Sequence, residues 1–321
     1  MTAPGSTAAS AATAAATDAD GVTEPFVLVA GADGLHHAGG AARHLAGRAV
    51  TAVTASDPGT AWALVDGTDV VRVAGDSAEE DVARLDDGRG RCLHRHRETL
   101  YVGGAGARLW RLDGDDLVRV TSFDHAPTRD EWSTPWGGPP DVFSLASHGD
   151  DLYVSVHVGG ILRSDDGGRS WRATIDLHDD VHQVAVDGDG TVWAATGRRG
   201  LARSTDQGRT WQHLATGLHA TYLLSVAVTS VGVLVGAQSG HAGSDTAVYL
   251  LEGDRFEPVT GLPVPLSGIS PGHLAARGAT AALVTDAGTV HLSHDGGRTW
   301  QQADGTVPGP RGLVVTDPPP R

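Results

Sequence analysis

The sequence predicts an all-β fold, a seven-bladed β-propeller of four-stranded antiparallel blades closed by the C-terminal strand. Three observations lead to it: a repeated octapeptide, seven apolar segments at regular spacing, and one apolar segment left over at the end of the chain. The glycine content favours the same class, because 44 of the 321 residues are Gly and helix interiors tolerate Gly poorly.

The octapeptide follows the pattern S-x-D-x-G-x-[ST]-W and occurs three times, at Ser164–Trp171, Ser204–Trp211 and Ser293–Trp300. The starts lie 40 and 89 residues apart, so the second interval holds two periods of about 40 residues, as in propeller blades. The Asp carboxylate can accept backbone N–H groups, Gly permits a tight turn and Trp can pack into the sheet. These residues are therefore interpreted as structural.

Seven apolar segments mark one strand in each unit, about 35 to 52 residues apart. They are Phe26–Val29, Ala61–Val65, Leu100–Val102, Leu152–Val156, Val192–Ala195, Val233–Val235 and Ala282–Val284. A further strand precedes most of them, and Gly/Asp turns separate the strands, which indicates a unit of four short antiparallel strands.

The two ends of the chain predict how the ring closes. The first unit begins at Phe26 without a preceding strand, and Gly312–Thr316 is a spare apolar strand that can complete it. Closure removes the exposed sheet edges of an open array. We therefore expect one propeller over residues 23–321, preceded by a disordered tail over residues 1–22, which is rich in Ala, Thr, Ser and Asp.

Composition excludes several function classes. Lys and Asn are absent, so lysine-based catalysis and N-glycosylation are excluded, and the net charge of −15 argues against a nucleic-acid partner. The single cysteine, Cys92, excludes an intramolecular disulfide. No signal peptide and no apolar run of about 18 residues is evident, so we expect a soluble, cytoplasmic monomer without a membrane partner.

The three octapeptides resemble Asp boxes, the BNR repeats of sialidase-like propellers, which also occur in sortilin-type receptors, xyloglucan-degrading hydrolases and photosystem II assembly factors. The resemblance implies a hairpin at the blade periphery and says little about function. Sialidase activity is not expected, since those enzymes carry an Arg-Ile-Pro-type motif near the first blade. No such tripeptide occurs here, and the corresponding region, Gly34–Gly40, has no Arg.

Propeller ligands usually bind at the channel mouth, and the loops that reach it are where functional groups are expected. One such loop is the long connection between blades three and four, Ser122–Asp141. Its candidate ligand-binding residues are Arg129, Glu131, Trp132 and Trp136. The two Trp side chains could form a stacking platform for a sugar or a flat ligand; alternatively, they fill a gap beside the blade.

Histidines of three consecutive blades are predicted to meet on the same face: His157, His182 and His219. The position of His182 holds Thr51 and Phe143 in other blades, so the blade itself does not require His there. Imidazoles that converge from separate strands suit a divalent transition metal, with Asp179 or Asp180 as an additional ligand. Without a metal, His182 or His219 could act as general base, with Tyr222 or an Arg such as Arg198 as polariser.

Three functions remain open at this stage. The chain could bind a small molecule, glycan or peptide at the channel-mouth face of blades three to six. It could be a His- or metal-dependent lyase or hydrolase, or a divergent glycosidase, at the same site. It could also be a scaffold that docks a protein partner. A binding role requires exposed Trp132 and Trp136, whereas an enzyme requires the three histidines near one another and near a carboxylate or metal.

Overall fold

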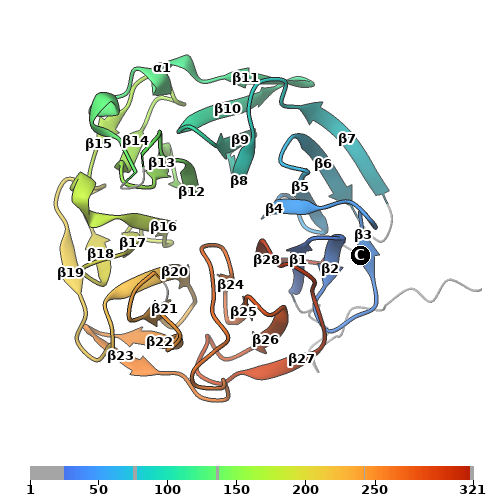
Figure 1. Ribbon diagram of the computed structural model, residues 1–321, viewed down its shortest axis with the longest axis vertical. Helices are drawn as coiled ribbons and strands as arrows, with labels where there is room; N and C mark the ends of the chain where they lie inside the picture. The colour runs from blue at the N-terminus through green and yellow to red at the C-terminus, as the bar shows by residue number, and fades with distance from the viewer. Residues whose placement is uncertain (1–24, 75–77, 135–136, 242, 319–321) are drawn as a thin grey trace, which may run out of the picture.

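Seven four-stranded antiparallel sheets form a ring around a central channel (Figure 1), which confirms the predicted seven-bladed propeller. The computed structural model describes residues 25–74, 78–134, 137–241 and 243–318. The tail predicted over residues 1–22 lies outside the described residues. The longest helix described, α1 (Thr121–Asp124), has four residues, and none is long and apolar enough to cross a membrane.

Each blade runs from an innermost strand at the channel to an outermost strand at the rim. The strands of blades one to four, in that order, are β28 (Gly312–Thr316), β1 (Phe26–Gly31), β2 (Gly34–His37) and β3 (Arg43–His44); β4 (Val50–Ala55), β5 (Thr60–Val65), β6 (Asp69–Ala74) and β7 (Ala78–Arg84); β8 (Gly90–His96), β9 (Thr99–Gly104), β10 (Arg108–Asp113) and β11 (Asp116–Arg119); β12 (Val142–His148), β13 (Asp151–Val156), β14 (Gly160–Ser164) and β15 (Arg172–Ala173).

Blades five to seven repeat the arrangement. Their strands are β16 (Val181–Val186), β17 (Val192–Thr196), β18 (Leu201–Ser204) and β19 (Gln212–Leu214); β20 (Tyr222–Val228), β21 (Val233–Gln238), β22 (Ala247–Glu252) and β23 (Arg255–Pro258); β24 (Leu274–Arg277), β25 (Thr280–Val284), β26 (Thr289–Ser293) and β27 (Gln301–Thr306). Two 3-10 turns, η1 (Arg129–Glu131) and η2 (Leu177–Asp179), precede the innermost strands of blades four and five.

The C-terminal strand closes the ring, as predicted. Strand β28 pairs antiparallel with β1, in a register that sets Thr316 opposite Phe26 and Gly312 opposite Ala30. It also contacts the innermost strands on both sides, β24 and β4. The first and last described strands therefore share one blade, and every sheet has neighbours on its two faces.

The core lies between neighbouring blades, because each sheet packs both faces against the next. The second strands β13, β17 and β25 are buried along their whole length. Large side chains fill the wedge at the rim, where the blades diverge: Phe123 packs against Trp171 with ring centroids 5.0 Å apart. The connection between blades three and four supplies Phe123, so it completes this core.

The three octapeptides form the turns between the third and fourth strands of blades four, five and seven. In each, the Asp carboxylate accepts hydrogen bonds from the Ser hydroxyl two residues before it and from the backbone N–H and hydroxyl of the Ser or Thr four residues after it. The Trp that ends the octapeptide inserts into the blade in the first and third copies. We refer to Ser164–Trp171, Ser204–Trp211 and Ser293–Trp300 as the box turns.

The innermost strands of blades two to six share a second feature, a β-bulge after their first residue or, in blade six, after their second. There the register against the next strand shifts by one, and one side chain is left over. A bulge re-aims its extra side chain, and in blades four, five and six that side chain lines the pocket described below. We call these five positions the bulge positions; they hold Thr51, Arg91, Phe143, His182 and Leu224.

Candidate functional site

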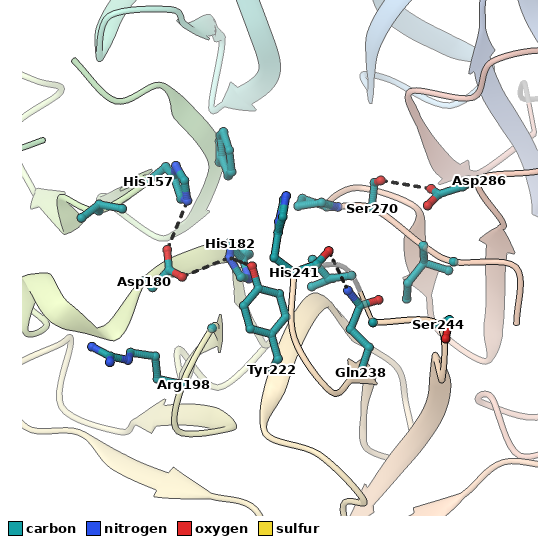
Figure 2. Close-up of a pocket in the computed structure, with 18 of the residues that line it drawn as sticks. His157, Asp180, His182, Arg198, Tyr222, Gln238, His241, Ser244, Ser270 and Asp286 are labelled. Carbon is teal, nitrogen blue, oxygen red and sulfur yellow. Dashed lines mark hydrogen bonds and ion pairs between the residues drawn. The ribbon is translucent and has the colours of Figure 1, made fainter. Parts of the chain in front are cut away.

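A pocket of about 1060 Å³ opens at the channel mouth (Figure 2). It is lined by the bulge positions of three consecutive blades, Phe143, His182 and Leu224, and by loops of blades four to seven. Because strands alternate in direction, this end of the blades is opposite to the box turns. Its apolar wall includes Val158, Leu177, Leu266 and Ile269. The pocket therefore spans blades four to seven, whereas the face predicted from the sequence was that of blades three to six.

The polar end of the pocket is a cluster of four side chains from three blades. Nε2 of His157 lies 3.2 Å from Oδ1 of Asp180, and Nε2 of His182 lies 3.6 Å from Oδ2 of the same carboxylate. The hydroxyl of Tyr222 lies 3.3 Å from Nε2 of His182. Figure 2 shows these side chains pointing towards one another across the loops of blades four, five and six. We call His157, Asp180, His182 and Tyr222 the polar cluster.

Asp180 and His182 reach the pocket from the start of strand β16. Asp180 immediately precedes this strand and His182 is the extra residue of its bulge, so both side chains depart from the regular alternation of the strand and line the pocket. Asp180 follows the turn η2 in the left-handed conformation, with φ of 52°, which Asp tolerates better than most residues. A Cβ at Gly197 would lie 2.3 Å from Oδ2 of Asp180, so the carboxylate can occupy this place only because residue 197 is Gly.

The neighbouring residue, Asp179, stabilises this turn through its side-chain contacts. Its side chain is 1% exposed and accepts hydrogen bonds from the guanidinium of Arg199, including one of 2.7 Å from Nε. Nε2 of His213 lies 3.2 Å from its other oxygen. The sequence left Asp179 and Asp180 as alternatives, and the structure separates them: Asp179 is held by these partners, whereas Asp180 lines the pocket.

The environment sets the charge of the cluster. Burial opposes ionisation of Asp180, but the hydrogen bonds and charges of His157 and His182 outweigh it and lower the pKa of Asp180. Burial and the nearby Asp180 carboxylate raise the pKa of Tyr222. Nδ1 of His182 lies 2.6 Å from the carbonyl oxygen of Leu223 and donates to it. The other nitrogen, Nε2, therefore carries the lone pair of a neutral His182 and faces Asp180 and Tyr222.

His157, Asp180 and His182 could hold a metal ion. Each offers one ligand atom, and these atoms all lie within 4.8 Å of one another. The predicted trio of His157, His182 and His219 differs in its third member. His219 lies beside Tyr249 and Asp245 instead, with Nδ1 2.8 Å from the Tyr249 hydroxyl and Nε2 3.4 Å from the Asp245 carboxylate. Strand β20 begins only at Tyr222, so His219 precedes the strand that would have carried it into the cluster.

On the connection between blades three and four, the described residues of the predicted platform, Arg129, Glu131 and Trp132, are not among those that line this pocket. Trp132 is 7% exposed, packs on Phe123 and donates its indole N–H to Thr128. Arg129 stacks over Trp132 and donates to the carbonyl oxygens of Ala107 and Gly106. Trp132 thus fills a gap between blades three and four, as the alternative interpretation stated. Glu131 is exposed to solvent, and Trp136 lies outside the described residues.

Arg198 lies where the sequence placed it, on the turn after the second strand of blade five. It is exposed and lines the pocket, and its backbone carbonyl accepts the hydroxyl of Thr221. Its guanidinium makes no hydrogen bond or ion pair with the part of the chain that is described. The pocket rim therefore presents one positive charge to a ligand.

Sequence reasoning missed the wall that blades six and seven supply. Gln238 ends strand β21, His241 lies on the loop that follows it, and Ser270 and Asp286 come from blade seven (Figure 2). The hydroxyl of Ser270 donates to Asp286 over 3.0 Å, and Nδ1 of His273 lies 3.2 Å from the same carboxylate. A hydrogen bond from His273 lowers the pKa of Asp286. His241 lies on the loop after the second strand of its blade, as His157 and Arg198 do. Searching the sequence for polar residues at this position could therefore have identified it.

Comparisons with known proteins support the architecture. No protein-family model and no curated protein matches the sequence. A structure of YCF48 bound to a D1 peptide is 15% identical, with a TM-score of 0.58 over 84% of this chain and 93% of that one. A streptogramin B lyase is 12% identical, with a TM-score of 0.61 over 83% and 86% of the two chains.

A third similar structure is the GH74 xyloglucanase from Xanthomonas campestris, which is 17% identical with a TM-score of 0.56. The likeness covers 87% of this chain but only 47% of the xyloglucanase. At such low identities the likenesses establish the fold alone, since one fold can carry unrelated functions. The chain is a β-propeller that shares its architecture with a peptide-bound protein, a lyase and a glycan-degrading enzyme.

Proposed function

We propose that this chain binds a small polar molecule in the pocket of blades four to seven. One observation carries the proposal: an apolar cavity of about 1060 Å³ ends in the converging polar groups of the polar cluster. Pockets of roughly 300–1000 Å³ with a few convergent polar groups are typical of small-molecule sites. The exposed Arg198 on the rim favours a ligand with an anionic group.

A peptide is the next ligand class to consider, because the similar YCF48 structure holds a D1 peptide. Trp132 is buried, so the exposed Trp132 that the sequence analysis required for binding is not available, and the binding proposal depends on the pocket of blades four to seven instead. A glycan has less support for the same reason, since a buried Trp132 cannot offer a stacking face. We retain the assignment of the box turns as Asp boxes, and of the chain as a sialidase-like propeller without sialidase activity, as part of this proposal. A protein-docking role remains the alternative to a pocket ligand.

The binding proposal is tested with two matched substitutions. Ser267 is exposed and lines the pocket, whereas Ser230 is exposed on the turn between β20 and β21, at the opposite end of the blade. Fragments carrying carboxylate, amide or hydroxyl groups are screened by saturation-transfer NMR. We expect signals that Ser267→Trp reduces about tenfold or more and that Ser230→Trp leaves unchanged. Fragments whose signals survive Ser267→Trp would contradict the proposal.

A second candidate is catalysis in the same pocket, by a lyase or hydrolase. The contact of 3.3 Å between the Tyr222 hydroxyl and Nε2 of His182 favours it, because two groups in such contact can exchange protons with a bound substrate. In this role His182 is the base, Tyr222 the acid or polariser, and Asp180 the carboxylate that stabilises a protonated His182. A similar structure, the streptogramin B lyase, shows that the fold supports this class of enzyme.

Catalysis is tested on the fragments that bind. Each is incubated with the protein and followed by NMR for new resonances. We expect turnover to slow by about 100-fold or more in Tyr222→Phe while binding persists. Binding without any chemical change in the native protein would leave ligand binding as the function and remove the catalytic candidate.

A further inference from the structure

The polar end of the pocket combines three donor atoms of the kind that transition metals prefer. We propose that His157, Asp180 and His182 bind a divalent transition-metal ion at the base of the pocket. The proposal goes beyond ligand binding and rests on the proposed pocket only for access from solvent. It replaces His219, which the sequence placed in the metal site, with Asp180.

Distances between the donor atoms fit a metal centre. Zinc–ligand bonds of about 2.0–2.1 Å place neighbouring donors roughly 3.3 Å apart in a tetrahedron. Nε2 of His157 lies 3.2 Å from Oδ1 of Asp180, and Nε2 of His182 lies 3.6 Å from Oδ2. The largest separation within the set stays below 4.8 Å. A small rotation of the imidazoles therefore completes the site.

The hydrogen bonding of His182 provides a second reason. Its Nδ1–H donates to the carbonyl oxygen of Leu223 at 2.6 Å, so a neutral ring directs its Nε2 lone pair at the Asp180 carboxylate. Two electron-rich atoms that face each other repel unless a proton or a cation lies between them. A backbone carbonyl that holds the second ring nitrogen is also the usual arrangement for a metal-binding His.

The side chains around the three donors keep them in place. Phe143 stacks on His157 with ring centroids 4.6 Å apart and an angle of 7° between the planes. Tyr222 packs on His182 at 4.9 Å. The side chains of His157 and Asp180 are 12% and 25% exposed, so an ion can enter from the pocket. Such support reduces the entropy that the ligands lose on binding a metal.

Two imidazoles and one carboxylate leave further coordination positions open. This donor set suits Zn²⁺ with a water as fourth ligand, and also Fe²⁺ or Mn²⁺ in octahedral sites. The Tyr222 hydroxyl adjoins Nε2 of His182 and is placed to hydrogen-bond a ligand in an open position. A metal would thus anchor the anionic or carbonyl group of a pocket ligand.

The experiment uses the full chain stripped of metal with a chelator and titrated with Zn²⁺ alone by calorimetry. Co²⁺ is then used as a spectroscopic probe, since its visible absorption reports coordination by nitrogen and oxygen ligands. The variants are Asp180→Asn, which keeps the shape of the side chain, and His182→Phe, which copies the bulge position of blade four. His219→Gln is the matched control.

We expect one Zn²⁺ per chain in the native protein and in His219→Gln. Loss of one of three protein ligands should weaken binding by about 100-fold or more in Asp180→Asn and His182→Phe. Thermal unfolding without metal shows whether each variant is folded; if His182→Phe is not, His157→Gln replaces it. A native protein without stoichiometric Zn²⁺, or equal affinity in Asp180→Asn, would overturn the proposal.

The outcome is independent of the pocket ligand. Ser267→Trp should reduce fragment binding and leave Zn²⁺ affinity within about threefold of the native value, because Ser267 is not among the donors. Fragment binding without Zn²⁺ binding would refute the metal site and support the pocket as a ligand site. Zn²⁺ binding without fragment binding would support the metal site and refute the proposed pocket ligand.

Discussion

The box turns and the bulge positions recur around the same ring, yet they behave in opposite ways. In the three box turns the same residue types make the same hydrogen bonds around Asp166, Asp206 and Asp295. The five bulge positions share a backbone geometry but hold five different residues. The box turns repeat the same side chains and stabilise the blades. The bulge positions repeat only the backbone geometry, and their different side chains distinguish one sector of the ring from the others.

The two regions also differ in where their partners come from. Hydrogen bonds from the Thr210 hydroxyl and backbone, four residues away, lower the pKa of Asp206 to about 2. Asp180 depends on His157 of the preceding blade as well as on His182. A box turn is therefore a local unit, while the polar cluster exists only when neighbouring blades are assembled.

The largest expected effect is the loss of a box Trp. Trp171 is 8% exposed and packs on Phe123, so Trp171→Ala should lower the free energy of unfolding by about 3–5 kcal/mol. The control is Trp62→Ala in blade two, where the Trp side chain is partly exposed. This variant should lose less free energy of unfolding than Trp171→Ala. Urea denaturation measures both. If folded Trp171→Ala protein bound Zn²⁺ more weakly than the native protein, the box turn and the pocket would be coupled. That result would contradict the view that the box turns stabilise blades without affecting the polar cluster.

A smaller effect is expected from the box carboxylate. Asp166 accepts hydrogen bonds from the Ser164 and Ser170 hydroxyls and from the backbone N–H groups of Arg169 and Ser170. Asp166→Ala should therefore lower stability by about 2 kcal/mol. The adjacent Asp165 is exposed, and the buried guanidinium of Arg163 that it pairs with is also held by Asp151, so Asp165→Ala should cost less, below about 1 kcal/mol. Equal losses in the two variants would show that the box geometry contributes little.

The smallest effect is a pH dependence. The pKa of Asp206 is lowered from 3.8 to about 2 in the folded chain. The contribution of this carboxylate to the free energy of unfolding is therefore almost complete above pH 4 and is lost as the pH falls through 2. The stability difference between the native protein and Asp206→Asn should be largest near neutral pH and should disappear as the pH falls through 2. Denaturation at several pH values measures it, with Asp189→Asn as a control on an exposed turn. A difference independent of pH would contradict the assigned hydrogen bonds.

Much of the fold could be predicted because its signals are local. The carboxylate of a box turn accepts its hydrogen bonds from groups within four residues of it, so the octapeptide identifies the turn at any point in the chain. The unpaired strand at Phe26 and the spare strand Gly312–Thr316 predicted the pairing of β1 with β28 without any knowledge of the contacts between them. Comparison of blades also indicated that the position of His182 was free to vary, and the bulge explains why.

The site was predictable only in part, because its geometry depends on side chains from different blades. His157 and His182 were expected to converge and do so, but Asp180 rather than His219 completes the trio. That choice follows from the left-handed turn at Asp180 and the absence of a Cβ at Gly197. Likewise, no local pattern distinguishes an exposed Trp132 from one that fills a gap between blades.

The sequence by itself determined the number of blades, their closure and the box turns, since these depend on short-range hydrogen bonds and on the alternation of apolar residues. Only the tertiary structure decided which sector of the ring has a pocket and which carboxylate faces His157 and His182. The physical reason is that a propeller brings together residues that are distant in the chain, such as His157 and Asp286, through the packing of whole blades. Small differences in loop length and bulge geometry then decide which side chains meet.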